Sequence, residues 1–374
     1  MRFSIWTGPA WEDWAPLSVD EGGIGGSETA AVMVSRELAR LGHEAIVYGQ
    51  FKEGTEGKTD GVDYMHYKRV VDVGQIRGDV FISSRNIDAL MLQPNARAKA
   101  VWVHDINLGH DQYDRLDKYD TILVLSKWSA NTFEAYYPHV RRSRIFVTRN
   151  GLDLSRFKPE MNTSEILQKK KWKIFYSSSP DRGLDKLLDM WPDIRSIRSD
   201  INLELHVYYG FDNWKLMAKD NPAAINKILW FEERLRRMAH EGVVFHGRVG
   251  QRELAEAQME SVMWLYPTDF KETSCITGME AMAAGAVPVC TSLAALKETI
   301  GDRGVLIKPY NMEPRYQDDF VNVVRDLLCD SEKRSAMATT ARAHALRELS
   351  WEGVALQWEE HFKKVIAAKE LSNG

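Results

Sequence analysis

The sequence has few cysteines and no long apolar run, and these two shortages limit the kinds of protein it can be. Its 374 residues include three cysteines, Cys275, Cys290 and Cys329. An odd, sparse count without metal-ligand spacing argues against a disulfide framework or a zinc site, so we expect a reducing, cytoplasmic compartment. No apolar run approaches the ~20 residues that a membrane-spanning helix needs. Residues 1–6 are interpreted as a short strand, not a signal peptide, because no small-residue cleavage site follows them.

The sequence also lacks an excess of basic residues. Its formal net charge is -4. Proteins that bind nucleic acids usually carry a basic domain, so no nucleic-acid partner is expected. The hydrophobic share of 44% and the charged share of 27% are ordinary for a soluble globular chain. A chain of this length can form two domains, each with its own core.

One stretch carries the strongest pattern. The apolar run 262–266 predicts a buried strand that ends at Pro267. After a loop, residues 276–284 predict a helix of small residues, with Gly285 just past its end, and the next strand begins at 287–290. This order places the loop at the carboxyl end of a strand, where open α/β sheets bind their ligands.

Two carboxylates, Glu272 and Glu280, stand eight positions apart in this stretch. Taken alone, they fit a solvated loop acid and a surface helical acid. The backbone amides of Cys275, Ile276 and Thr277 would be first-turn donors, which favour an anion. Glu280 lies about one turn further along the predicted helix, where it could accept hydrogen bonds from hydroxyl groups of the same ligand.

A glycine-rich loop precedes the first predicted helix. The pattern is a strand, this loop, a helix and a second strand, over residues 2–7, 8–27, 29–41 and 44–48. Ser27 is the expected N-cap, and Gly25 and Gly26 would let the backbone approach a phosphate closely. An unliganded turn explains the glycines equally well. The loop lacks G-x-G-x-x-G spacing, and the second strand ends without the acid expected for the ribose of NAD, which counts against a dehydrogenase.

Short apolar runs alternate with helical patterns in both halves of the chain, which predicts an α/β fold with two doubly wound parallel sheets. The remaining predicted strands are 80–83, 100–103, 121–125, 144–148, 173–177, 203–208, 243–245 and 305–307. We expect an N-terminal domain at 1–157, a linker at 158–171 and a second domain at 172–348. The tail 351–374 carries a helical apolar stripe, which predicts a packing helix.

The stretch 262–290 resembles the signature of the retaining nucleotide-sugar glycosyltransferases of family 4, glycosyltransferases group 1. The match comprises Glu272, seven residues, Glu280, then Ala-Met-Ala-Ala-Gly and an apolar strand. Weaker similarities extend from the glycine loop to the last helix. The resemblance implies the GT-B fold, two Rossmann-like parallel-sheet domains facing across a cleft. It also implies that helix 351–374 packs back on the first domain.

The resemblance implies roles for the carboxylates and for one histidine. Glu272 would contact the donor sugar, and Glu280 would hold the ribose of the nucleotide. His104 follows the predicted strand 100–103 and matches the active-site histidine, beside the donor sugar and the reacting centre. Asp105 would orient this imidazole or meet the acceptor.

In the family, a pair of basic residues binds the diphosphate in the turn that corresponds to 177–183. Here Arg182 occupies the second position, and the first falls near Ser177, so one cation is missing. Backbone amides or Ser178 would take its place. The Phe-x-Gly pattern that ends at Gly247 implies that Gly247 and Arg248 lie beside the nucleotide base, although Arg248 fits a solvated residue as well.

The predicted activity is transfer of a sugar, with retention, from a nucleotide-diphosphate sugar to a hydroxyl acceptor. No Asp-x-Asp motif occurs, so no metal cofactor is expected. A nucleotide-sugar 2-epimerase of the same fold and a non-catalytic nucleotide-sugar or glycan-binding protein are the alternatives. The acceptor, whether glycan, lipid, protein or small molecule, stays open, and so does peripheral contact with a membrane.

Overall fold

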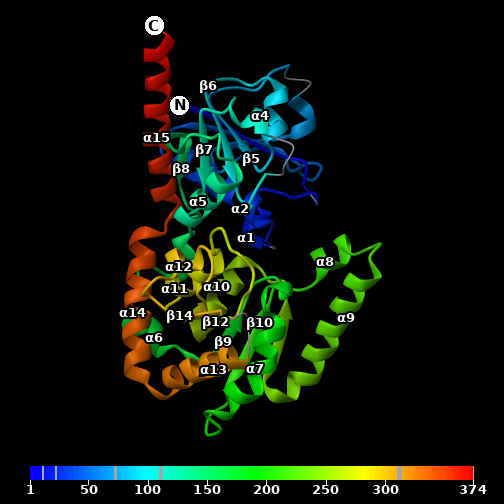
Figure 1. The fold of residues 1–374 in the computed structure, drawn as a ribbon, viewed down its shortest axis with the longest axis vertical. Coiled ribbons are helices and arrows are strands. Elements are labelled where there is room, and N and C mark those ends of the chain that lie inside the picture. The colour runs from blue at the N-terminus through cyan, green and yellow to red at the C-terminus, as the bar shows by residue number, and fades with distance from the viewer. Residues whose placement is uncertain (11, 22, 71–73, 109–112, 310–313, 374) are drawn as a thin grey trace. The chain divides into compact units, whose positions relative to one another are not determined.

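The computed structural model describes the whole chain except residues 11, 22, 71–73, 109–112, 310–313 and 374. The chain forms two compact units (Figure 1). The first consists of Met1–Asp153 and Leu349–Gly374, and the second of Leu154–Glu348. Residues 158–171, the expected linker, therefore lie within the second unit. There, helix α6 (Thr163–Gln168) packs against helix α14 (Ser331–Glu348).

The first unit is built on an eight-stranded sheet with the order β3-β4-β2-β1-β5-β6-β7-β8. Its strands are β1 (Arg2–Gly8), β2 (Glu44–Gly49), β3 (Gly57–Thr59), β4 (Val62–His66), β5 (Arg77–Ser84), β6 (Asn95–Val103), β7 (Thr121–Val124) and β8 (Ile145–Val147). Among these described strands, β3 and β4 pair antiparallel and the other pairs are parallel. The sequence analysis missed β3 and β4, because β3 is polar and largely exposed and carries no apolar run.

The helices of the first unit are α1 (Ser18–Glu21), α2 (Gly26–Arg40), α4 (Tyr113–Leu116), α5 (Lys127–Tyr136) and α15 (Trp351–Asn373). The expected start of the first long helix was wrong. Gly25 is the N-cap of α2, and no side chain caps this end. Ser27 lies inside the helix, and its hydroxyl donates to Glu28 Oε2 at 3.0 Å. Because α2 already begins at Gly26, Ser27 is a first-turn residue and not its cap.

Helix α15 packs on α2 and β6 and completes the core of the first unit. Trp358 is fully buried, and its indole Nε1 donates to Thr148 Oγ1 at 2.9 Å. Its ring meets that of Trp102 edge-on, with centroids 4.7 Å apart. Phe362, one turn further on, is buried against Phe3. The last helix is therefore a structural part of this unit.

The second unit is built on a six-stranded sheet with the order β11-β10-β9-β12-β13-β14, and all described pairs are parallel. Its strands are β9 (Lys171–Tyr176), β10 (Glu204–Tyr208), β11 (Val243–Gly247), β12 (Ser261–Tyr266), β13 (Val287–Thr291) and β14 (Val305–Ile307). The strand order changes direction between β9 and β12. Open α/β sheets bind ligands at the carboxyl ends of strands at such a point.

Helices and 3₁₀ turns connect these strands. Besides α6 and α14 they are η5 (Leu154–Phe157), η6 (Pro180–Arg182), α7 (Leu184–Ser196), α8 (Asp212–Met217), α9 (Pro222–Arg237), η7 (Met238–Glu241), α10 (Gln251–Glu260), α11 (Ile276–Ala283), α12 (Leu296–Thr299) and α13 (Pro314–Cys329). Helix α9 begins at Pro222. The Asn221 side chain caps it by accepting from the Ala224 amide at 3.2 Å, and Pro222 occupies its first turn, a start signal that the sequence analysis overlooked.

The turns after β9 and β12 touch at one glycine. Gly183 has a φ of 105°, in the region that side chains disfavour. A Cβ built at Gly183 would lie 2.3 Å from the carbonyl oxygen of Pro267. Glycine is therefore required for the close approach of these two turns.

We expect Trp358→Ala to destabilise the first unit by about 3–5 kcal/mol, because it removes a buried aromatic ring and leaves Thr148 Oγ1 without its indole donor. Trp358→Phe, which keeps most of the apolar volume, should cost clearly less. Urea unfolding of both variants measures the difference. A loss below ~1 kcal/mol for the alanine variant would contradict the packing role of α15.

Gly183→Ala should destabilise the second unit by roughly 1–3 kcal/mol from backbone strain alone, with the overlap at Pro267 adding to it. Gly26→Ala is the matched control, because a Cβ at Gly26 meets nothing within 4 Å. The unfolding midpoints of the two variants should therefore differ. Equal midpoints would show that the two turns move apart freely.

Candidate functional site

The turns that follow β9 and β12 bring Arg182 and Glu272 together. Glu272 is 7% exposed. The phenol of Tyr266, the last residue of β12, donates to Glu272 Oε1 at 2.6 Å, and Arg182 Nη1 donates to the same oxygen at 3.0 Å. The Arg182 guanidinium also lies over the Phe270 ring, 3.9 Å from its centroid. Glu272 is thus a buried acceptor that two donors hold in place. It is not the solvated loop acid that its position in the sequence, taken alone, would suggest.

The charges in this cluster support one another. Burial alone would lower the pKa of Arg182. The neighbouring Glu272 carboxylate, together with Tyr266 and Asp181, raises it by more, so the pKa of Arg182 is raised overall. Burial and the Glu272 carboxylate both raise the pKa of Tyr266 well above its usual value. The guanidinium therefore stays charged and the phenol stays a hydrogen-bond donor at any ordinary pH.

The start of α11 lies next to the turn after β9. Cys275 is the buried N-cap residue of α11, and Thr277 Oγ1 donates to the Ser177 carbonyl oxygen at 3.4 Å. Ser177 and Ser178 are both nearly buried, and Ser177 Oγ has no hydrogen-bond partner among the described residues. The amides of Ile276 and Thr277 are in the first turn, where an α-helix supplies no acceptor. Several donors thus gather at one helix end.

Glu280 lies further along α11 and is 5% exposed. Gln258 Nε2 donates to its Oε2 at 3.3 Å, and Arg156 Nη2 lies 3.5 Å from its Oε1. Burial raises the pKa of Glu280, while Arg156 and Gln258 oppose this shift. The sequence analysis missed Arg156. Its position, three residues after Asp153, gave no sign that it would reach α11.

Gly247 is the last residue of β11 and Arg248 follows it, on the far side of β10 from this cluster. Gly247 has a φ of 69°, and its carbonyl oxygen accepts from the Tyr209 amide at 2.9 Å. Tyr209 itself has a φ of 106° and is 42% exposed. Backbone strain at a non-glycine residue is typical of functional sites. Tyr209 is a further candidate that the sequence analysis did not identify.

In the first unit, Arg85 contacts two residues of the predicted site region, Asp105 just after β6 and Ser27 in the first turn of α2. It follows β5, and its Nε donates to Asp105 Oδ2 at 2.9 Å, while Nη1 lies 3.4 Å from Ser27 Oγ. His104 follows β6, with its ring 4.4 Å from that of Trp102. Burial, and to a smaller extent Arg85, lower the pKa of His104 to about 3. The imidazole is therefore neutral at ordinary pH.

The predicted glycines lie at the start of α2, in the same region as Arg85. Gly25 is the N-cap residue, and a Cβ built there would lie 2.1 Å from Glu28 Oε2. Gly26 opens the helix. Arg85 was not predicted as a site residue. Its guanidinium bonds to both Ser27 and Asp105 and so links the start of α2 to the end of β6.

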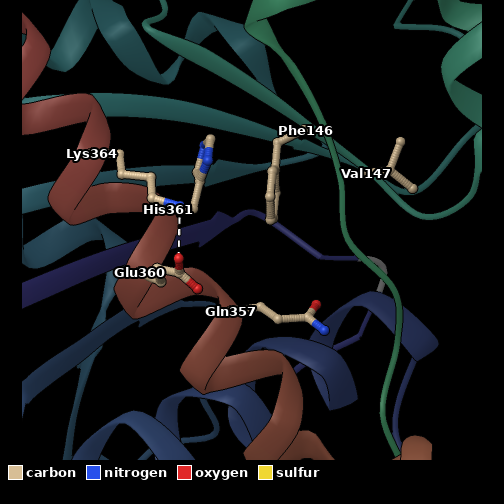
Figure 2. A pocket seen from close by; sticks show the side chains of 6 residues that line it. All are labelled: Phe146, Val147, Gln357, Glu360, His361 and Lys364. Atoms are coloured by element: carbon tan, nitrogen blue, oxygen red, sulfur yellow. Dashed lines mark hydrogen bonds and ion pairs between the residues drawn. The ribbon is translucent and has the colours of Figure 1, made fainter.

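A cavity of about 310 Å³ on the first unit contains none of the predicted site residues (Figure 2). It is lined by Phe146, Val147, Gln357, Glu360, His361 and Lys364. His361 stacks on Phe146 at 3.9 Å and bonds through Nε2 to Thr121 Oγ1 at 3.0 Å. Burial lowers the pKa of His361 to about 4. These contacts are those of a packing residue.

Within the described residues, no cluster of three or more His, Cys, Asp or Glu side chains is suited to hold a metal ion. None of the described helices combines the length and apolar character that a membrane crossing requires.

Sequence comparison supports a glycosyltransferase relationship for the second unit. Residues 173–330 match the family model of the glycosyl transferases group 1. The lipopolysaccharide 1,2-N-acetylglucosaminetransferase of Salmonella typhimurium is 26% identical over 191 residues, which are 50% of this chain and 46% of that enzyme. The chain thus matches less than half the length of this relative. The spore coat protein SA of Bacillus subtilis is 24% identical over 80% of this chain and 83% of its own.

Structural comparison extends over nearly the whole chain. Sucrose-phosphate synthase of Thermosynechococcus elongatus superimposes with a TM-score of 0.72 at 14% identity, covering 98% of this chain and 100% of that one. The HepE protein of Anabaena, solved in complex with UDP, superimposes with a TM-score of 0.68 at 15% identity, covering 97% and 100%. Together with the two largely parallel sheets, these similarities show a GT-B glycosyltransferase fold with two Rossmann-like units, and the match to the group 1 glycosyl transferase model lies within the second of them.

Proposed function

We propose that this protein is a retaining glycosyltransferase of family 4, which moves a sugar from a nucleotide-diphosphate sugar to a hydroxyl acceptor in glycan biosynthesis. The observation that carries the proposal is the cluster in which Arg182 and the buried Tyr266 both donate to the buried Glu272, beside the first turn of α11. It combines a cation, a fixed carboxylate and helix amides at the strand ends where α/β sheets bind nucleotides.

The diphosphate would bind between Arg182 and the start of α11. Arg182 has five N–H donors, and only some of them are needed for Glu272. The first-turn amides of Ile276 and Thr277 and the unsatisfied hydroxyl of Ser177 would complete the anion site. As the bond to the sugar breaks, negative charge builds up on the diphosphate, and donors fixed in advance stabilise it. The Ser177 hydroxyl and the nearby Ser178 would partly replace the family's missing cation.

The two carboxylates would hold the two ends of the donor. Glu272, fixed by Tyr266 and Arg182, would accept hydrogen bonds from the sugar hydroxyls and keep the anomeric carbon aligned. Glu280 would accept bonds from the ribose, and Gly247 and Arg248 would lie beside the base.

The first unit would supply the acceptor side. A neutral His104 can both donate and accept a hydrogen bond, which suits a residue beside the reacting hydroxyl groups. Asp105, held by Arg85, would contact the acceptor. We propose attack on the same face of the sugar from which the diphosphate leaves, without a stable covalent intermediate.

The first donors to test are UDP sugars, because the similar Anabaena protein was solved with UDP and the Salmonella relative transfers N-acetylglucosamine. Calorimetry with UDP-glucose and UDP-N-acetylglucosamine measures binding, and release of free sugar measures turnover without an acceptor. Binding with no turnover, even with acceptors supplied, would favour a binding protein, which the missing first cation also suggests. A 2-epimerised product would instead reveal an epimerase.

We expect Glu272→Gln to lower turnover by ~10- to 100-fold, because a neutral amide forms weaker hydrogen bonds to the sugar than a carboxylate does. UDP affinity should change little, since UDP carries no sugar. Asp269→Asn is the matched control, because Asp269 is exposed and pairs with Lys186. A glutamine variant with wild-type turnover would refute the role of Glu272.

We also expect turnover to survive EDTA, because the sequence has no Asp-x-Asp motif for a metal diphosphate. The measurement compares initial rates with EDTA and with added Mg²⁺ or Mn²⁺. A rate that collapses in EDTA and returns with Mg²⁺ would show that a metal neutralises the diphosphate in place of the missing cation.

A further inference from the structure

We infer that Arg156 is a positioning residue of the donor site, which holds the Glu280 carboxylate in its charged form and in the orientation that a ribose diol needs. The inference rests on the proposed function, because it gives Glu280 the ribose as its ligand. Arg156 itself is assigned no contact with the donor. It acts through Glu280.

The geometry places Arg156 against Glu280 in a protected environment. Its Nη2 lies 3.5 Å from Glu280 Oε1, and the two side chains are only 13% and 7% exposed. Its Nη1 donates to Gln251 Oε1 at 2.5 Å, and its guanidinium lies 5.6 Å from the centre of the Phe157 ring. The guanidinium is thus held between α10 and its own turn η5. A buried ion pair is screened little by solvent, so it acts strongly on the carboxylate.

The turn that carries Arg156 is itself anchored. Arg342 of α14 is fully buried, and its Nη2 donates to the carbonyl oxygens of Phe157 and Lys158, each at 3.0 Å. These two residues directly follow Arg156. The backbone next to Arg156 is therefore fixed from a third helix, which restricts where the guanidinium can lie.

The contact with Gln258 also indicates that Glu280 is a charged carboxylate. Gln258 is fully buried, and its Nε2 donates to Glu280 Oε2 at 3.3 Å. In this orientation Gln258 Oε1 has no hydrogen-bond partner among the described residues. The Gln258 side chain thus donates through Nε2 to the carboxylate, while its Oε1 is left without a donor in the described part of the chain. Both oxygens of Glu280 therefore face donors, the arrangement expected around a charged carboxylate.

Charge matters here because burial works against it. Burial raises the pKa of Glu280, and Arg156 is the largest influence in the opposite direction. A protonated carboxyl group has one oxygen that donates, so it accepts less well from two adjacent ribose hydroxyls. Without Arg156, the carboxyl would take up its proton at a higher pH than in the wild type.

Other charged groups on the helices that pack against α11 do not replace Arg156. On α14, Arg342 bonds to backbone carbonyls, including that of Ala283. On α10, Glu260 pairs with Lys171 and Lys173. The remaining charged residues of α10 and α12 are exposed, namely Arg252, Glu253, Glu256, Lys297 and Glu298. On α14 the remaining ones are Glu332, Lys333, Arg334, His344, Arg347 and Glu348.

The test compares the binding of UDP and 2′-deoxy-UDP by calorimetry between pH 5.5 and 8.5. The ratio of the two dissociation constants isolates a ribose hydroxyl and cancels the titration of the phosphates. Wild type should prefer UDP by ~10-fold, the value of one hydrogen bond to a charged group. Glu280→Gln should lose this preference at every pH.

Arg156→Gln should lose the preference at low pH and regain it as the pH rises, because Glu280 then becomes charged again. The midpoint of this recovery should lie at a higher pH than any loss in the wild type. Arg156→Lys, which keeps the charge, should stay close to wild type. Arg198→Gln is the matched control, because it removes an exposed pairing with Asp200 in the same unit.

Two results would overturn the inference. One is a wild-type ratio in Arg156→Gln at every pH, and the other is a loss that does not change with pH, which would indicate a purely structural role. If Arg156→Gln does not fold, Arg156→Lys decides, since a pH-independent loss there has the same meaning. A wild-type protein that binds none of UDP, ADP and GDP would instead overturn the proposed function.

Discussion

The candidate site depends on the ion pair between Arg182 and Glu272. Glu272 is buried, and a buried carboxylate is costly unless donors surround it. Arg182 and the Tyr266 phenol supply these donors, and the contact between Gly183 and Pro267 keeps the two turns close enough for them to meet. Packing and electrostatics thus depend on one another here, because neither turn alone could hold a charged side chain inside the protein.

Helix α11 has different partners at its two ends. At its carboxyl end, Lys170 donates to the Ala284 carbonyl oxygen at 2.8 Å, and Arg342 donates to that of Ala283. These two side chains satisfy carbonyls that the helix leaves open, and the Arg342 guanidinium complements the negative end of its dipole. At its amino end, the donors point towards the turn after β9. The protein's own side chains therefore complete one end, and the other end is where we propose that the diphosphate binds.

The fold could be predicted from the sequence because buried strands appear as local patterns. Glu272 and Glu280 were predicted as site residues from the resemblance to a family signature, and their roles stay a prediction. Apolar runs revealed the buried strands, and the spacing of Glu272 and Glu280 followed from one loop and one helix. The partners Arg85 and Arg156 were missed because each reaches its acid across more than ten residues of sequence. The polar strand β3 was missed because it has no apolar run. The start of α2 was misplaced because its N-cap is Gly25, a residue without a side chain that could signal a cap.

Glu272 and Glu280, the two acids of the signature, are both stabilised inside the protein by hydrogen-bond donors, but the donors differ. Each is buried, and each has an arginine and a neutral donor beside it, Tyr266 for Glu272 and Gln258 for Glu280. The arginines come from different parts of the chain, Arg182 from the turn after β9 and Arg156 from the start of the second unit. A carboxylate that must accept hydrogen bonds from a ligand inside a protein needs a cation that is not the ligand. The spacing of the two acids can therefore be read from the sequence, but the pairing of Glu272 with Arg182 and of Glu280 with Arg156 becomes visible only in the fold.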